Sequence, residues 1–191
     1  MTTGRRPLDA YMTPYVLARH ICARVASVTG TVKHILEPGA GTGNFVAAAR
    51  ATWPDVHITA LDINPSYEEQ CKKQGADEFY HTDYTTSSPS LGFDLIIGNP
   101  PYVLGNKFVE IATGGGGFVC FLMRAAFRSS VGRWEPGGVL RKSPPLVSWP
   151  VVPRPSFTDK GTEHSEYEAF MWAPDSVVYM RRIEPIMWRE T

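Results

Sequence analysis

The sequence predicts an α/β fold in which a mostly parallel sheet carries helices on both faces. Apolar runs of strand length alternate with helical patterns through the first two thirds of the chain, and most of these runs are apolar throughout. Such runs are typical of parallel strands buried on both faces of a sheet. Residues 146–152 and 166–172 form two later strand-like runs, which we expect to pair as an antiparallel hairpin. The predicted fold is therefore a seven-stranded, mostly parallel sheet with an antiparallel C-terminal hairpin.

The individual elements follow from caps and apolar periodicity. Thr13 and Pro14 are typical of a helix start, with Thr13 as the N-cap, and we expect Gly30 to end this helix. The other expected elements are helices at residues 44–51, from residue 64 onward and at 124–131, and strands at 32–36, 56–61, 77–81, 93–97 and 117–123.

Length and composition indicate one domain. A chain of 191 residues can bury a full core, and no repeat or long linker divides it, so we expect residues 1–191 to form a single domain without a separate target-recognition domain. No apolar run reaches the roughly 18 residues of a membrane span, and the N-terminal segment lacks the apolar core of a signal peptide. We therefore expect a cytoplasmic protein that does not bind membranes, most simply a monomer.

The cysteines, histidines and charges narrow the classes of function. Three scattered cysteines and five histidines form no CxxC, HxH or HExxH pattern, so we expect neither a metal site nor a disulfide framework. The net charge is zero, but one segment carries six cations against the single acid Glu135. This excess is compatible with a phosphate-facing surface and equally with an ordinary solvated face. The six cations are Arg124, Arg128, Arg133, Arg141, Lys142 and Arg154.

A glycine-rich turn, ILEPGAGTGNF, follows the first predicted strand. Gly39, Gly41 and Gly43 allow the backbone to turn tightly and a ligand to lie against bare peptide, although a simple strand–helix turn needs glycine too. No lysine follows Gly43, which argues against a phosphate-binding P-loop. Glu37, just before the turn, would repel a pyrophosphate but suits a ligand with an ammonium group.

Two aspartates indicate the rest of this ligand. Asp62 ends the second predicted strand, where a carboxylate can accept hydrogen bonds from ribose hydroxyls. Asp83 follows the third strand and can accept from an exocyclic adenine amine. The implied ligand has a ribose, an adenine and a cationic amino-acid end but no phosphate. S-adenosyl-L-methionine (SAM) fits this description.

The segment GNPPY follows the fourth predicted strand. Pro100 and Pro101 lack a backbone N–H and hold the chain stiff and extended, which leaves the Asn99 and Tyr102 side chains at the end of the strand. The side-chain oxygen of Asn99 and the carbonyl of Pro100 can accept hydrogen bonds from a planar amine and make its nitrogen more nucleophilic. The alternative is a proline-stiffened turn at the edge of a sheet.

Taken together, EPGAGTG, Asp62, Asp83 and NPPY resemble the class I SAM-dependent methyltransferases. NPPY resembles the amino-methyltransferase branch, and the chain is most similar to small phage and bacterial N6-adenine DNA methyltransferases. The resemblance covers about residues 9–123, including the segment YMTP, and implies a Rossmann-like fold. The SAM-contacting residues it implies are Thr13, Glu37, Gly39, Ala40, Gly41, Gly43, Asp62, Ile63, Asp83 and Asn99, with Thr13 helping to hold the cofactor's carboxylate.

The resemblance also implies an acceptor site. Asn99, Pro100, Pro101 and Tyr102 would be catalytic, with the Tyr102 ring stacking on an adenine that has been flipped out of a duplex. In the C-terminal hairpin we expect Phe157 as a second stacking face and Arg154 as a phosphate or base contact. The alternative for Phe157 is packing within the hairpin.

We therefore expect a SAM-dependent N6-adenine methyltransferase that acts on DNA in the cytoplasm, which for a phage-encoded enzyme is the cytoplasm of the host. Cytosine C5 methylation needs a cysteine nucleophile that typically follows proline, and no cysteine here does. Three alternatives stay open: an RNA adenine methyltransferase, a protein glutamine-N5 methyltransferase of the release-factor type, and a SAM- or nucleic-acid-binding module without catalysis.

Overall fold

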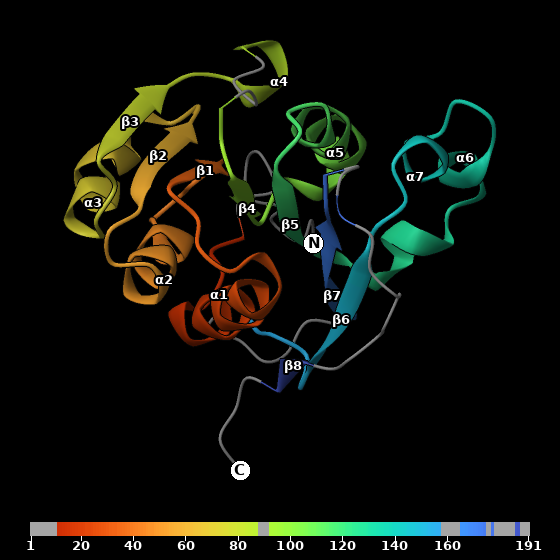
Figure 1. The fold of residues 1–191 in the computed structure, drawn as a ribbon, viewed down its shortest axis with the longest axis horizontal. Helices are drawn as coiled ribbons and strands as arrows, with labels where there is room; N and C mark the ends of the chain where they lie inside the picture. Colours follow the sequence, from red (N-terminus) through yellow and green to blue (C-terminus); the bar gives the residue numbers. More distant parts are fainter. Residues whose placement is uncertain (1–10, 88–91, 158–164, 175–176, 178–185, 188–191) are drawn as a thin grey trace, which may run out of the picture.

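The computed structural model describes residues 11–87, 92–157, 165–174, 177 and 186–187. In this part of the chain eight strands form one sheet in the order β3-β2-β1-β4-β5-β7-β6-β8 (Figure 1). Seven of these strands were predicted, and the two-residue β8 is added at the edge beside β6. The strands are β1 (His34–Pro38), β2 (His57–Asp62), β3 (Glu78–His81), β4 (Leu95–Gly98), β5 (Phe118–Arg124), β6 (Val147–Val152), β7 (Tyr167–Trp172) and β8 (Ile186–Met187).

The pairing of the strands confirms the predicted mixed sheet. β1 runs parallel to β2 on one side and to β4 on the other, and β3 and β5 extend the parallel sheet outward. β7 is antiparallel to both β5 and β6, as expected for the hairpin. The chain passes from β1 outward to β2 and β3 and then returns to β4 on the other side of β1. Such a switch in strand order opens a crevice at the carboxyl ends of the strands, where α/β proteins bind ligands.

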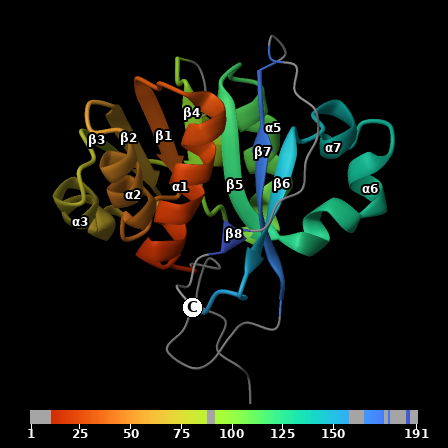
Figure 2. The same ribbon diagram turned by 60° about the horizontal axis from the view of Figure 1, so that its bottom comes forward.

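Helices cover both faces of the sheet (Figures 1 and 2). The long helices α1 and α2 pack against one another on one face, and α5 lies on the other. The α-helices are α1 (Tyr15–Thr29), α2 (Asn44–Thr52), α3 (Glu68–Lys73), α4 (Tyr84–Ser87), α5 (Gly105–Thr113), α6 (Val131–Trp134) and α7 (Val139–Lys142), and the 3-10 helices are η2 (Pro65–Tyr67), η3 (Tyr102–Leu104) and η4 (Ala125–Ser129). None of these helices is long and apolar enough to cross a bilayer.

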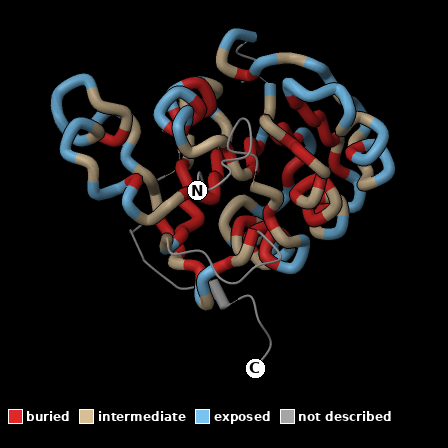
Figure 3. The backbone as a smooth tube through the Cα atoms, turned by 180° about the vertical axis from the view of Figure 1, so that it is seen from behind, coloured by how far each residue is buried: buried red, intermediate tan, exposed pale blue. Residues whose placement is uncertain are grey.

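The core consists of two apolar layers, one on each side of the sheet. The buried face of α1 (Leu17, Ile21 and Val25) packs with strand residues such as Ile35 into one layer. The other layer includes Phe108 of α5 together with aromatic residues of β5 and β7. Figure 3 shows the resulting buried strands in the middle of the molecule and exposed loops at its periphery. Burial on both faces explains why the strands are apolar throughout.

Three predicted details differ in the structure. Pro14 rather than Thr13 occupies the N-cap position of α1. The helix has no side-chain cap, because proline has no side-chain acceptor and the Thr13 hydroxyl has no hydrogen-bond partner. The helix expected at 124–131 is divided into η4 and α6, since Ser130 between them adopts an extended conformation. Helix α5 was not predicted, because its glycine start and β-branched residues weaken the helical pattern.

Candidate functional site

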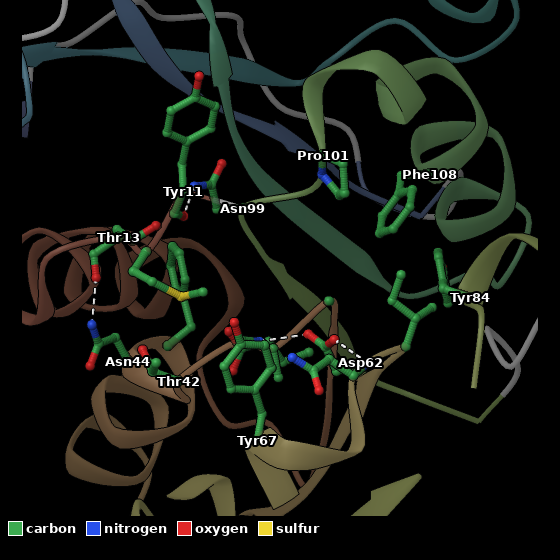
Figure 4. Close-up of a pocket in the computed structure, with 18 of the residues that line it drawn as sticks. Tyr11, Thr13, Thr42, Asn44, Asp62, Tyr67, Tyr84, Asn99, Pro101 and Phe108 are labelled. Carbon is green, nitrogen blue, oxygen red and sulfur yellow. Dashed lines mark hydrogen bonds between the residues drawn. The ribbon is translucent and has the colours of Figure 1, made fainter. Parts of the chain in front are cut away.

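A cavity of about 250 Å³ opens at the carboxyl ends of β1, β2 and β4 (Figure 4). It therefore lies at the switch in strand order, where the fold predicts a ligand site. Its walls come from the segment before α1, the glycine turn, the loops after β2 and β3, and the segment from Asn99 into α5. The lining residues are Tyr11, Met12, Thr13, Glu37, Gly39, Ala40, Gly41, Thr42, Asn44, Phe45, Asp62, Ile63, Asn64, Tyr67, Thr82, Asp83, Tyr84, Asn99, Pro101, Leu104 and Phe108.

The glycine turn forms the floor beside β1. Gly39, Gly41 and Gly43 all have positive φ angles, between 51° and 77°, which side chains other than glycine rarely adopt. A Cβ atom at Gly43 would also lie 3.2 Å from the Cα of Cys71, so this glycine allows α2 to approach α3 closely. Gly43 thus supports the turn without lining the cavity.

Asp62 holds the turn in place. One carboxylate oxygen, Oδ2, accepts a hydrogen bond from the backbone N–H of Gly41 at 2.8 Å, and Oδ1 accepts from the N–H of Asn64 at 2.8 Å. Each carboxylate oxygen can accept a second hydrogen bond. Asp62 can therefore stabilise the turn and still accept from hydroxyl groups of a ligand.

Four buried polar atoms of the cavity residues have no hydrogen-bond partner, one each in Thr13, Glu37, Tyr84 and Asn99. Oε2 of Glu37 and Oγ1 of Thr13 are two of these unpaired atoms, and the two residues are only 3% and 4% exposed. Burial raises the pKa of Glu37 well above its ordinary value, an effect that the backbone amide of Val46 opposes and the charge of Asp62 reinforces. Buried polar groups are normally paired, so an unpaired carboxylate oxygen and an unpaired hydroxyl indicate a site for a polar, cationic ligand.

The loop after β3 contributes an acid and an aromatic wall. Oδ1 of Asp83 accepts hydrogen bonds from the backbone N–H and the hydroxyl of Thr85, at 2.8 and 2.7 Å, which fixes its side chain. The buried ring of Tyr84 packs on Phe108 of α5, with the ring centroids 4.9 Å apart. A flat apolar wall beside a carboxylate suits a planar ring that carries an amine.

Asn99 lies where the cavity meets the segment before α1. Its Nδ2 donates a hydrogen bond to the backbone carbonyl of Tyr11 at 3.0 Å (Figure 4). Because a carbonyl can only accept, this contact fixes the orientation of the amide and turns Oδ1 away from Tyr11. Oδ1 is buried and has no hydrogen-bond partner, so it can accept a hydrogen bond from a ligand.

The rings expected to stack on a base are covered by the protein's own side chains. The Tyr102 ring stacks on Tyr11, with centroids 5.6 Å apart and planes inclined by 22°, and tilts against Tyr167 at 5.6 Å. Phe157 packs on Tyr11 at 5.6 Å and on Tyr167 at 5.1 Å. We call Tyr11, Tyr102, Phe157 and Tyr167 the aromatic cluster. In this structure the Tyr102 ring is therefore not a free stacking surface, because Tyr11 occupies the position beside it.

The structure brings most of the predicted site residues together. Nine of the ten expected cofactor contacts line the cavity, with Gly43 the exception, and Pro101 lines it as well. Pro100, Tyr102, Arg154 and Phe157 do not. Eleven lining residues were not among the predicted site residues: Tyr11, Met12, Thr42, Asn44, Phe45, Asn64, Tyr67, Thr82, Tyr84, Leu104 and Phe108. Asn44 had a usable signal, since it directly follows the glycine turn and its side chain donates to the Thr13 carbonyl at 2.7 Å.

Comparisons with known proteins agree with this geometry. No family model matches the chain. It is 38% identical over 88 residues to a tRNA1(Val) (adenine(37)-N6)-methyltransferase of a Flavobacteriaceae bacterium, covering 42% of this chain and 38% of the relative. It is also 38% identical over 69 residues to a type II methyltransferase of a Paramecium bursaria Chlorella virus, covering 36% of this chain and 18% of the relative. Malonyl-[acyl-carrier protein] O-methyltransferases are among the relatives too. The chain thus spans less than two fifths of the length of the first of these relatives.

Solved structures show the same fold over most of the chain. A Thermoplasma acidophilum protein superposes with a TM-score of 0.68 at 18% identity, over 89% of this chain and 92% of that one. The type IIG restriction endonuclease BpuSI superposes with a TM-score of 0.70 at 15% identity, over 91% of this chain and 26% of that one. The homologues of this chain are class I SAM-dependent methyltransferases, and the chain has the Rossmann-like fold of that class.

Proposed function

We propose that this chain is a SAM-dependent methyltransferase domain that methylates the N6 amine of adenine in DNA. The observation that carries the proposal is the unpartnered Oδ1 of Asn99, held at the edge of a cavity whose other unpaired groups suit SAM. Its relatives include an adenine-N6 methyltransferase and several type II methyltransferases, which supports the same chemistry.

The cavity residues fit SAM by the chemistry of their unpaired atoms. Glu37 would accept hydrogen bonds from the ammonium group, and Thr13 would donate to the carboxylate of the amino-acid end. Asp62 would accept from the ribose hydroxyls and Asp83 from the adenine amine, beside Tyr84 and Phe108. When bound, SAM supplies an electrophilic methyl group on a sulfonium.

Asn99 would prepare the acceptor nitrogen. The lone pair of the adenine amine is delocalised into the ring, so the amine is a weak nucleophile. Oδ1 of Asn99 and the Pro100 carbonyl would accept hydrogen bonds from the two N–H groups of this amine. They would favour a more tetrahedral nitrogen, whose lone pair is free to attack a methyl group. The stiffness of Pro100 and Pro101 keeps this carbonyl in place, so the protein contributes positioning and electrostatics.

Transfer of tritium from labelled SAM tests this proposal. The purified protein is incubated with methylation-free DNA, with RNA and with total protein, and the digested products are separated by chromatography. We expect label in N6-methyldeoxyadenosine from DNA and a rate of labelling lower on the order of 100- to 1000-fold after replacement of Asn99 by alanine. Label in glutamine or in RNA alone would overturn the DNA assignment. SAM binding without any transfer would indicate a module that lacks catalysis.

A further inference from the structure

Arg124 lies at the carboxyl end of β5, the strand beside the one that leads to Asn99. β4 pairs with β5 in parallel, so both strands deliver the residues after their ends to the same edge of the sheet. The guanidinium carbon of Arg124 lies 5.0 Å from the centroid of the Tyr102 ring. β7 pairs Arg124 with Tyr167, which adds a second member of the aromatic cluster next to it. Arg124 is thus a cation at the acceptor side of the site.

No carboxylate neutralises this arginine within the described parts of the chain. The neighbouring acid on β7, Glu168, pairs with Arg128 instead, at 2.9 Å. The groups that face Arg124 are the tyrosines Tyr11, Tyr102 and Tyr167. Its Nε is buried and has no hydrogen-bond partner. A half-buried guanidinium with an unused donor and no counter-ion needs an anion, because an arginine in a protein does not lose its charge.

We propose that Arg124 binds a phosphate group of the nucleic acid strand that carries the methylated base. This inference rests on the proposed function and deepens it, since it makes the acceptor a polyanion. A planar guanidinium matches a phosphate with two hydrogen bonds. A base that reaches Asn99 brings its own backbone to the same edge of the sheet, whereas a glutamine side chain of a protein brings no anion there.

A purely structural arginine is the competing interpretation. In that case Arg124 only packs on Tyr102 by a cation–π contact, and its loss would lower stability without any link to salt. The salt dependence of binding separates the two roles, because each neutralised phosphate contributes about 0.7–0.9 to the slope of log K against log salt concentration.

The experiment measures binding of a fluorescently labelled, adenine-containing oligonucleotide by anisotropy, with S-adenosylhomocysteine present, over a series of NaCl concentrations. The variants are Arg124→Gln, Arg124→Lys and, as the matched control, Arg141→Gln, which removes an exposed charge from α7 in the same basic segment. Thermal unfolding and S-adenosylhomocysteine affinity are measured for each variant. We expect Arg124→Gln to weaken binding roughly tenfold and to reduce the slope by about one. Arg124→Lys should keep the slope, and Arg141→Gln should change neither quantity.

The outcomes distinguish this inference from the proposed function. An unchanged salt slope in Arg124→Gln, or an equal loss of binding affinity in Arg141→Gln, overturns the assignment of Arg124. In that case methylation of DNA by the wild-type protein still supports the proposed function. A wild-type protein that neither binds nor methylates nucleic acid overturns both.

Discussion

The site has a cofactor side, which is the cavity around Glu37 and Asp62, and an acceptor side, which is the region around Asn99 and Tyr102. The two sides differ in how open they are to a ligand. On the cofactor side, backbone contacts hold an open cavity, and the polar atoms of Glu37 and Thr13 lie buried without partners. On the acceptor side, the aromatic cluster fills the space around Tyr102, and the amide of Asn99 already donates to Tyr11. One side is formed in advance, whereas the other is closed by side chains of the protein itself.

This difference indicates which step of binding requires a rearrangement. The cofactor side depends on glycine φ angles and on hydrogen bonds from Asp62 to the backbone, which leave little freedom. The acceptor side depends on the Tyr11 ring, which is attached by rotatable bonds just before α1. A planar acceptor can reach Tyr102 only if Tyr11 moves, so we expect cofactor binding without a large change and acceptor binding with one.

The largest effect is expected for Asn99→Ala. This change removes the unpartnered acceptor but leaves the four side chains that would hold SAM in the proposed function, those of Thr13, Glu37, Asp62 and Asp83. We therefore expect kcat to fall on the order of 100- to 1000-fold while SAM affinity stays within a few-fold. Single-turnover transfer and calorimetric SAM titration measure the two quantities. Asn106→Ala is the control, since Asn106 contacts Arg133 outside the cavity. A full loss of SAM affinity in Asn99→Ala would place Asn99 on the cofactor side.

A smaller effect is expected for Glu37→Gln on the cofactor side. Loss of the carboxylate removes a charge-assisted contact to the ammonium group, so SAM affinity should fall by roughly 10- to 100-fold. Affinity for adenosine, which has no ammonium group, serves as the control and should not change. Equal losses for SAM and adenosine would show that the substitution collapses the cavity instead of removing one contact.

Tyr11→Ala tests whether the acceptor side is closed. An aromatic pair contributes about 0.5–1.5 kcal/mol, so freeing Tyr102 should lower the KM for DNA by about two- to tenfold. SAM affinity should change less than the KM for DNA, because Tyr11 is one of many residues that line the cofactor cavity. Tyr11→Phe keeps the ring and should behave like the wild type. A higher KM in the alanine variant alone would mean that Tyr11 takes part in holding the acceptor.

The smallest effect is the pH dependence of stability that Glu37 imposes. Burial raises the pKa of Glu37 in the folded protein above its ordinary value of 4.5. The folded state therefore binds the proton more tightly, and stability decreases as the pH rises from about 4.5 through the raised pKa. Glu37→Gln should be as stable as the wild type near pH 4 and more stable at neutral pH, as measured by urea unfolding without ligand. A variant that is less stable at neutral pH would contradict this sign.

Local patterns made the cofactor side predictable. The glycines, Glu37 and Asp62 stand at the ends of strands, and parallel strands deliver these ends to one edge, so order along the chain implies proximity. The acceptor side was not predictable in the same way. The contact between Asn99 and Tyr11 spans 88 positions, and the covering of Tyr102 depends on how Phe157 and Tyr167 pack, which no local pattern encodes. The break between η4 and α6 was likewise not predictable, because Ser130, which is extended there, is not a helix-breaking residue.

A crystal structure of the protein with bound SAM tests the central claim most directly. We expect the ammonium group of SAM within hydrogen-bond distance of Glu37, its ribose hydroxyls on Asp62 and its methyl group facing Oδ1 of Asn99. SAM bound at another place, or in this cavity with its methyl group turned away from Asn99, would contradict the account.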